Sequence, residues 1–113
     1  MTELSKLTIE DEAALERLSA ASAGMVARTC AWSDINTGSW NIDGLNSFSG
    51  VLADAFAELD GDVRLDDAPG FETIGSSGKI EMIHTAPILR VSSRPSAPVQ
   101  VVLTGHYDTV FPK

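Results

Sequence analysis

The chain opens with a helical pattern of apolar positions. Between Thr8 and Thr29 the larger apolar side chains recur every three or four residues, which is the spacing of one face of an α-helix. That face carries Ala14, Leu15, Leu18, Ala21, Ser22, Met25 and Val26. Thr8 and Asp11 have the spacing of a capping box, and Glu10, Asp11 and Glu12 place negative charge where the helix dipole is positive. We therefore predict a first helix over these residues, with Arg28 near its favourable carboxyl end.

A second helical pattern follows a polar stretch from Asp34 to Asn41, whose Asp, Asn, Ser, Thr and Gly content favours a loop. Asp43 is the expected N-cap of this second helix. Apolar side chains then recur at helical spacing, at Leu45, Phe48, Leu52, Ala55, Phe56 and Leu59. Asp60-Gly61 is expected to end the helix, with Gly61 in the left-handed conformation.

After Gly61 the pattern changes to the two-residue period of β-strands. Val63 and Leu65 alternate with polar residues, and Pro69 to Gly78 is expected to be a loop. Further strands are predicted at Ile80–His84 and Ile88–Val91, with Pro87 interrupting their pairing. After a turn at 95–98, the β-branched run Val99–Thr104 suits a central strand that is covered on both faces. Two helices followed by three or four strands predict an α/β fold of the sandwich type.

Composition narrows the classes of partner and compartment. The 113 residues suit one small domain, and the formal net charge of −8 disfavours nucleic acid and anionic membranes as partners. Cys30 is the only cysteine, so this chain alone can form neither an internal disulfide nor a thiolate zinc site, and we interpret Cys30 as a small buried apolar residue. The first ten residues lack the features of a signal peptide, and no apolar run is long enough to span a membrane. A cytoplasmic location is the default expectation.

The candidate chemistry lies at the end of the last predicted strand, in Gly105-His106-Tyr107-Asp108. In open α/β sheets ligands bind at the carboxyl ends of strands. A neutral imidazole is a good zinc ligand, and a nearby carboxylate can accept its second N–H and fix the tautomer. Gly105 would let metal and substrate approach the backbone. Two other interpretations stay open: a structural polar pair, or the start of an iron-oxygenase triad in which Asp108 also binds metal, although those oxygenases use many-stranded barrels.

The longer string from Val101 to Pro112 resembles the first metal motif of the M20 metallopeptidase family, which includes acetylornithine deacetylase, succinyl-diaminopimelate desuccinylase and glutamate carboxypeptidase. The stretch from Asn36 to Gly44 is similar to the Ser/Gly-rich loop of the glutamate carboxypeptidase branch, and Arg94-Pro95 with Ala97-Pro98 also resembles that branch. By this resemblance His106 is a metal ligand, and Asp108 is the catalytic-site aspartate that holds its imidazole. His84 matches no family ligand and is expected to be a surface residue.

The resemblance implies a zinc-dependent hydrolase, a metallopeptidase, carboxypeptidase or other amidohydrolase that cleaves amide bonds of peptides or N-acyl amino acids with a free carboxylate. Its cofactor would be two zinc ions, with cobalt or manganese as alternatives. Residues 1–113 would be the N-terminal portion of the catalytic domain, truncated after the first metal motif and inactive alone, in a protein that forms a homo-oligomer. The alternatives are a non-catalytic binding or assembly module of the same fold and the iron oxygenase.

Overall fold

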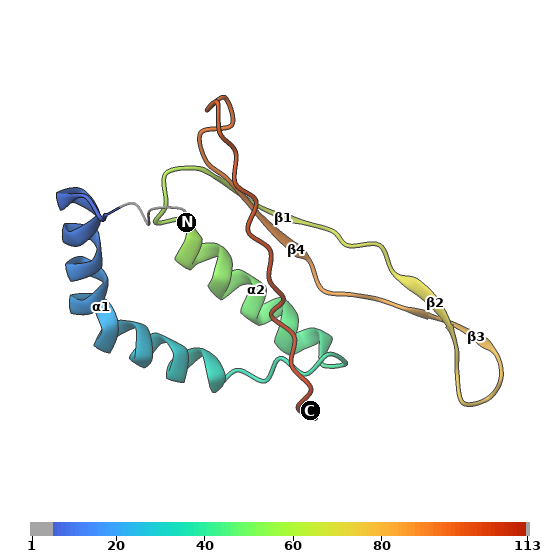
Figure 1. Ribbon diagram of the computed structural model, residues 1–113. Helices are drawn as coiled ribbons and strands as arrows, with labels where there is room; N and C mark the ends of the chain where they lie inside the picture. Colours follow the sequence, from blue (N-terminus) through green and yellow to red (C-terminus); the bar gives the residue numbers. More distant parts are fainter. Residues whose placement is uncertain (1–5, 113) are drawn as a thin grey trace, which may run out of the picture. The chain divides into compact units, whose positions relative to one another are not determined.

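The computed structural model describes residues 6–112, which form two helices and four short strands (Figure 1). Their order is α1 (Ile9–Ser33), α2 (Ile42–Phe56), β1 (Asp62–Asp66), β2 (Phe71–Ile74), β3 (Ile80–Ile83) and β4 (Ile88–Ser92). The chain divides into two compact units, one ending at Asp34 and one beginning at Ile35. The predicted α/β class is confirmed in this general sense: helices precede antiparallel strands.

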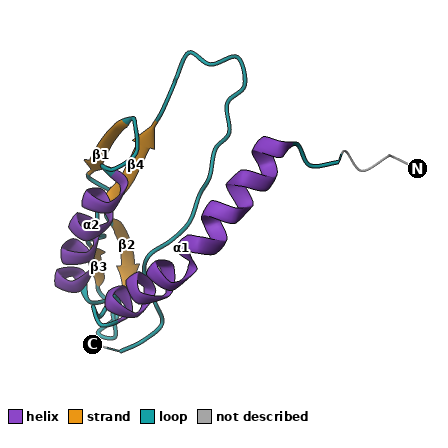
Figure 2. Cartoon of the chain, turned by 90° about the vertical axis from the view of Figure 1, so that its left-hand side faces the viewer, coloured by secondary structure: helices purple, strands orange, loops and turns teal. Residues whose placement is uncertain are grey.

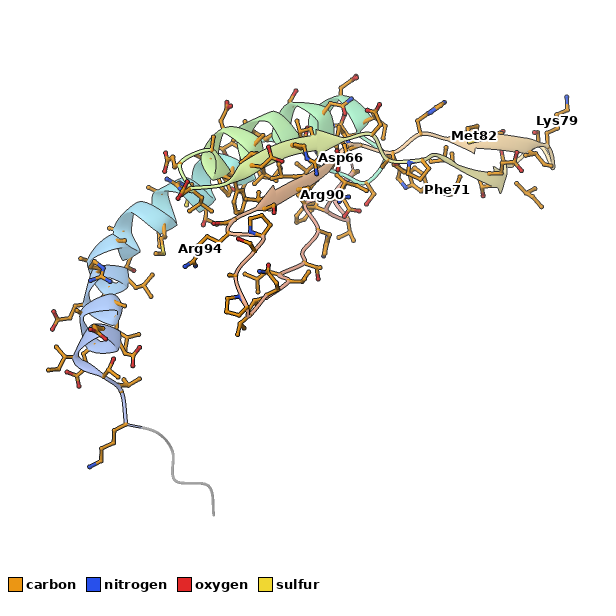
Figure 3. All side chains as sticks on the ribbon, turned by 90° about the horizontal axis from the view of Figure 1, so that it is seen from above. Asp66, Phe71, Lys79, Met82, Arg90 and Arg94 are labelled. Atoms are coloured by element: carbon orange, nitrogen blue, oxygen red, sulfur yellow. The ribbon has the colours of Figure 1, made fainter. Side chains whose placement is uncertain are left out.

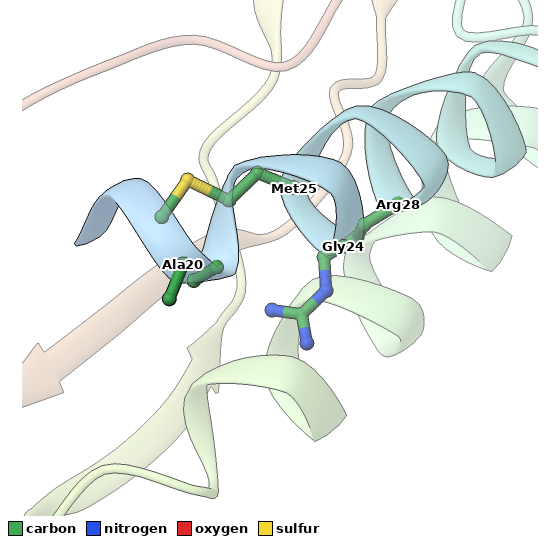
Figure 4. Close-up of a pocket in the computed structure, with 5 residues that line it drawn as sticks. Ala20, Gly24, Met25 and Arg28 are labelled. Carbon is green, nitrogen blue, oxygen red and sulfur yellow. The ribbon is translucent and has the colours of Figure 1, made fainter. Parts of the chain in front are cut away.

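The first unit is the helix α1, and its predicted cap is confirmed. The Thr8 hydroxyl accepts the Asp11 backbone N–H at 3.1 Å, and the Asp11 carboxylate accepts the Thr8 N–H at 2.8 Å. The helix continues past Thr29 to Ser33, since neither Gly nor Pro interrupts it there. A shallow hollow on α1 is lined by Ala20, Ala21, Gly24, Met25 and Arg28 (Figure 4). Cys30 is exposed, so its predicted burial is wrong for the described residues.

In the second unit α2 packs against the antiparallel pair β1–β4 (Figures 1 and 2). Val63 pairs with Val91 and Leu65 with Leu89, while Arg64 pairs with Arg90 on the alternate positions. The buried apolar side chains of the described residues are Leu45 and Phe48, both on α2, at 4% and 8% exposure. This small core is therefore built on one face of α2. No helix among residues 6–112 has the length and apolarity to cross a membrane.

The start and end of α2 correct two predictions. Asn41, not Asp43, is the N-cap: its side-chain oxygen accepts the Gly44 N–H at 3.3 Å, and Asp43 lies in the first turn, where its charge favours the helix dipole. The helix ends at Phe56, and Gly61 is not left-handed. Gly61 instead permits a close approach, because an added Cβ would lie 2.7 Å from the Ser92 carbonyl oxygen.

A second antiparallel pair, β2–β3, shows that part of the predicted Pro69–Gly78 loop is a strand. Phe71 pairs with Ile83 and Ile74 with Ile80. The connecting turn is closed by the Gly75 N–H to the Lys79 carbonyl at 2.8 Å, and Gly78 takes a φ of 76°, which glycine adopts without strain. In Figure 3 Phe71 and Met82 lie on this β2–β3 arm with Lys79 at its tip, and Asp66 lies beside Arg90, its partner at 3.1 Å.

The predicted central strand at Val99–Thr104 is not formed. The chain after β4 is one long loop (Figure 2), and no strand within residues 6–112 pairs with this run. Its apolar side chains are exposed, with Val102 at 84% and Leu103 at 91%. A β-branched sequence favours an extended backbone, but a strand also needs a neighbour whose backbone groups pair with its own. The described residues therefore support no sandwich built around this strand.

Candidate metal-binding site

The site forms where the polar turn Asn36–Asn41, which precedes α2, meets the segment 106–112. The Ser39 N–H donates to the Thr109 carbonyl at 3.0 Å, and the Thr109 N–H donates to the Thr37 carbonyl at 2.8 Å. These bonds make a short parallel bridge between Gly38 and Thr109. Figure 1 shows the C-terminal segment passing this turn. The bridge fixes the backbone directly after Asp108 to a turn that is remote in the sequence.

Short-range polar bonds shape the turn itself. The Asn36 side-chain oxygen accepts the Gly38 N–H at 3.0 Å and an N–H of the Asn41 side chain at 2.9 Å. The Asn36 amide donates to the Pro112 carbonyl at 2.7 Å. Gly38 has no room for a side chain, because an added Cβ would collide with the carbonyl oxygen of Phe111. The turn therefore needs glycine at 38 to accept the segment at such close range.

His106 and Asp108 lie together, as the sequence predicts. The His106 Nδ1 atom is 3.0 Å from Asp108 Oδ1 and 3.1 Å from the Asp108 carbonyl oxygen. An ionised carboxylate and a carbonyl can only accept, so Nδ1 must carry the proton. In neutral His106 the lone pair then lies on Nε2. The His106 side chain is 85% exposed, so this nitrogen belongs to an accessible ring.

Ser39 binds the other carboxylate oxygen. Its hydroxyl lies 2.7 Å from Asp108 Oδ2 and 3.0 Å from the Thr109 carbonyl. The pKa of Asp108 is held below its ordinary value first by the Ser39 hydrogen bond and then by the bond from His106. Both donors favour the ionised carboxylate. Asp108 is thus an anion at neutral pH with a donor on each oxygen.

Tyr107 anchors the segment on the opposite side. Its hydroxyl donates to the Pro87 carbonyl at 2.6 Å, and its ring lies 6.1 Å from the ring of Phe48, tilted by 57°. Burial, and secondarily the charge of Asp108, raises the pKa of Tyr107. Neighbouring side chains of an extended segment point to opposite sides, so Tyr107 faces the core while His106 and Asp108 face outward.

The sequence prediction identified part of this site and missed the rest. His106 and Asp108 are brought together, although at the end of an irregular segment and not of a strand. Ser39 and Tyr107 were not predicted as contacts; the polar turn at 36–44 was a signal for Ser39, but nothing in it indicated a contact with Asp108. A Cβ at Gly105 would meet nothing within 4 Å, so the described residues do not explain that glycine.

The described residues hold no complete metal site. Across residues 6–112 no group of three or more His, Cys, Asp or Glu side chains is placed to bind one ion. His84 is exposed beyond the end of β3, in agreement with its expected surface position. Comparison with family models, with curated proteins and with solved structures finds no match to this chain.

Proposed function

We propose that this chain is part of a zinc-dependent hydrolase of amide bonds, with His106 as a metal ligand and Asp108 as the residue that orients it. The observation that supports this most directly is the contact between His106 Nδ1 and Asp108 Oδ1 at 3.0 Å. Zinc-binding imidazoles commonly donate their second N–H to a carboxylate, which raises the basicity of the ligating nitrogen. The resemblance of residues 101–112 to the M20 metal motif points to the same roles.

The donor set fits one position in a zinc site. A neutral imidazole whose Nδ1 is protonated offers Nε2 to the metal, and the His106 ring is accessible enough to do so. A catalytic zinc usually takes three protein ligands, so the others must come from outside the described residues, in a longer polypeptide or another chain. Zinc held there would polarise the amide carbonyl and acidify a water molecule.

Asp108 is proposed to act through the imidazole and not as a metal ligand itself. Its Oδ1 accepts from His106 and its Oδ2 accepts from Ser39 at 2.7 Å, so each carboxylate oxygen already has a donor. Each oxygen keeps a second lone pair, but direct coordination, as in the iron-oxygenase interpretation, would make the metal share an oxygen that already accepts a charge-assisted bond. The arrangement favours the orienting role. Asp108 keeps the proton on Nδ1 and thereby keeps the Nε2 lone pair available.

The proposed substrates are peptides or N-acyl amino acids with a free carboxylate, and this assignment rests on the family resemblance alone. The same resemblance suggests two zinc ions and a homo-oligomer. A non-catalytic module that uses the same turn and segment is the second candidate. Reading the gene beyond codon 113 separates the two, because an open frame with further acidic and histidine ligands supports the enzyme and a stop codon supports the module.

The deciding experiment compares three variants of the full-length protein. His106→Ala should remove a direct ligand, lower the zinc content and abolish hydrolysis of an N-acyl amino acid. Asp108→Asn should weaken metal binding or activity by roughly 10–100-fold, because its amide loses the charge that supports the imidazole. His84→Ala is the matched control and should leave both unchanged, since it removes the chain's other histidine.

Zinc per protein, by mass spectrometry, and the rate of amide hydrolysis are the two readouts. Equal metal loss in His106→Ala and Asp108→Asn would favour direct coordination by Asp108 and contradict the proposal. Unchanged zinc content in both variants would mean that the pair is structural.

A further inference from the structure

We propose that Ser39 is a positioning residue for the metal ligand: through its hydroxyl it holds the Asp108 carboxylate in the orientation that makes His106 present Nε2 outward. The role of Ser39 in metal binding rests on the proposed function. Its effect on the orientation of Asp108 and His106 can be tested without metal. The Ser39 contact makes the Asn36–Asn41 turn a part of the site, although 69 residues separate Ser39 from Asp108.

The Ser39 hydroxyl has one proton and two acceptors within reach. The Asp108 Oδ2 atom is at 2.7 Å and the Thr109 carbonyl at 3.0 Å. A carboxylate is the stronger acceptor, and charge-assisted O–H bonds are the shorter ones. The proton therefore belongs to the bond with Asp108. The Thr109 carbonyl already accepts the Ser39 backbone N–H at 3.0 Å, so it does not depend on the hydroxyl.

Backbone hydrogen bonds hold Ser39 beside Asp108, and these bonds do not involve the Ser39 hydroxyl. The Ser39 N–H and the Thr109 N–H form the two bonds of the bridge, and neither uses a side chain. The close approach is set by Gly38, whose hydrogen faces the Phe111 carbonyl. Removing the hydroxyl should leave the bridge in place and release only the carboxylate. This separation of bridge and hydroxyl distinguishes positioning from a general structural role.

The consequence for Asp108 follows from its exposure. Its side chain is 46% exposed, so without Ser39 the carboxylate could rotate and exchange the His106 bond for bonds to water. With Oδ2 held by Ser39, Oδ1 stays beside Nδ1 at 3.0 Å. The tautomer of His106 then depends on a hydroxyl that does not touch the ring.

The test is the tautomer of neutral His106, measured from the nitrogen shifts of the ¹⁵N-labelled 113-residue chain without metal. The spectra are recorded at an alkaline pH at which the ring nitrogen shifts of both histidines no longer change with pH, which shows directly that both rings are neutral. Wild type, Ser39→Ala, Ser39→Thr and Ser93→Ala are compared. Ser93 is a matched control because its hydroxyl also reaches across the fold, to the Asp60 carbonyl at 2.6 Å. His84 is the internal reference for an exposed ring.

We expect His106 to be mainly Nδ1-protonated in wild type, Ser39→Thr and Ser93→Ala, and to shift toward the tautomer ratio of His84 in Ser39→Ala. Slow exchange of the Thr109 amide in all four proteins would show that the bridge persists. A wild-type ratio in Ser39→Ala overturns the proposal, as does a loss that Ser39→Thr does not restore. If the tautomer responds as expected while the full-length protein binds no zinc, the positioning holds and the proposed function fails.

Discussion

At the scale of single residues, Gly38 shows how a missing side chain makes the site possible. The carbonyl oxygen of Phe111 occupies the space that a Cβ would fill, and the Gly38–Thr109 bridge depends on that approach. Gly38→Ala should therefore separate the turn from the segment that carries His106. We expect a loss of stability of about 1–3 kcal/mol, the range for a local clash in a packed region, with faster exchange of the Ser39 and Thr109 amides.

Gly50→Ala provides the matched control for this prediction. Gly50 lies inside α2, and an added Cβ there would meet nothing within 4 Å. Alanine is the better helix former, so the same chemical change should stabilise the protein by about 0.5–1 kcal/mol. Urea unfolding of both variants measures the two effects. Equal and small effects would mean that the bridge tolerates a side chain and is not the close contact described above.

Asp108 gives a prediction about pH. Its folded pKa lies below the ordinary 3.8, so its contribution to stability is fully present above that value and is lost as the pH falls through the folded pKa. We expect the unfolding free energy to fall more steeply between about pH 5 and about pH 2 in wild type than in Asp108→Asn, which cannot titrate. Parallel curves for the two proteins would show that the bonds from Ser39 and His106 do not favour the ionised carboxylate. The side chain is nearly half exposed, so the difference should be small.

At the scale of elements, α1 shows how a local cap can stabilise a helix. It has 25 residues and begins with a complete capping box. The cap satisfies backbone N–H groups that have no partner inside the helix, so it should contribute to the stability of α1. Thr8→Ala removes the hydroxyl that accepts the Asp11 N–H and should cost the helix about 1 kcal/mol.

Thr29→Ala is the control for the cap, because the Thr29 hydroxyl bonds the Met25 carbonyl from inside the same helix. That bond does not cap an end of the helix, and alanine is the better helix former. The helicity of Thr29→Ala should therefore equal or exceed that of wild type. Thermal unfolding followed by circular dichroism at 222 nm compares the variants. A larger loss in Thr29→Ala than in Thr8→Ala would contradict the capping argument.

The elements that the sequence predicted well are those that local chemistry determines. The Thr8 cap, both helices and the strands β1, β3 and β4 follow from periodicity and capping within a few residues. The wrong predictions concern segments whose secondary structure depends on pairing with another strand. Phe71–Ile74 becomes a strand because β3 returns beside it, and Val99–Thr104 remains irregular because no strand among the described residues pairs with it.

The same distinction holds for the site. His106 and Asp108 are two positions apart, so their contact could be predicted from their spacing and chemistry. The bond from Ser39 to Asp108 spans 69 positions and depends on how the turn at 36–41 is folded. Polar residues in that turn indicated a loop, but the same residues could have formed a turn that contacts nothing. The assignment of zinc to His106 stays a prediction.

At the scale of the whole molecule, the described residues bury few large apolar side chains and leave many exposed. Leu45 and Phe48 are buried, while Val99, Val101, Val102 and Leu103 are at least 77% exposed. These four residues lie in an extended segment whose backbone pairs with no strand of the described chain. Unpaired extended backbone with β-branched side chains is a template for adding another strand.

We therefore predict that the isolated 113-residue chain self-associates through residues 99–103, against the repulsion of its net charge of −8. Replacing Val101 and Leu103 together by Lys should lower the association, measured as the sedimentation coefficient over a range of concentrations. Ser76 and Ser77, in the β2–β3 turn, accept the same two substitutions as the control for charge alone. The two double variants reduce the net negative charge equally, and a less negative chain repels its copies less. A decrease in association confined to the Val101 and Leu103 variant must then come from the lost apolar side chains, whereas a monomeric wild type at high concentration would refute the prediction.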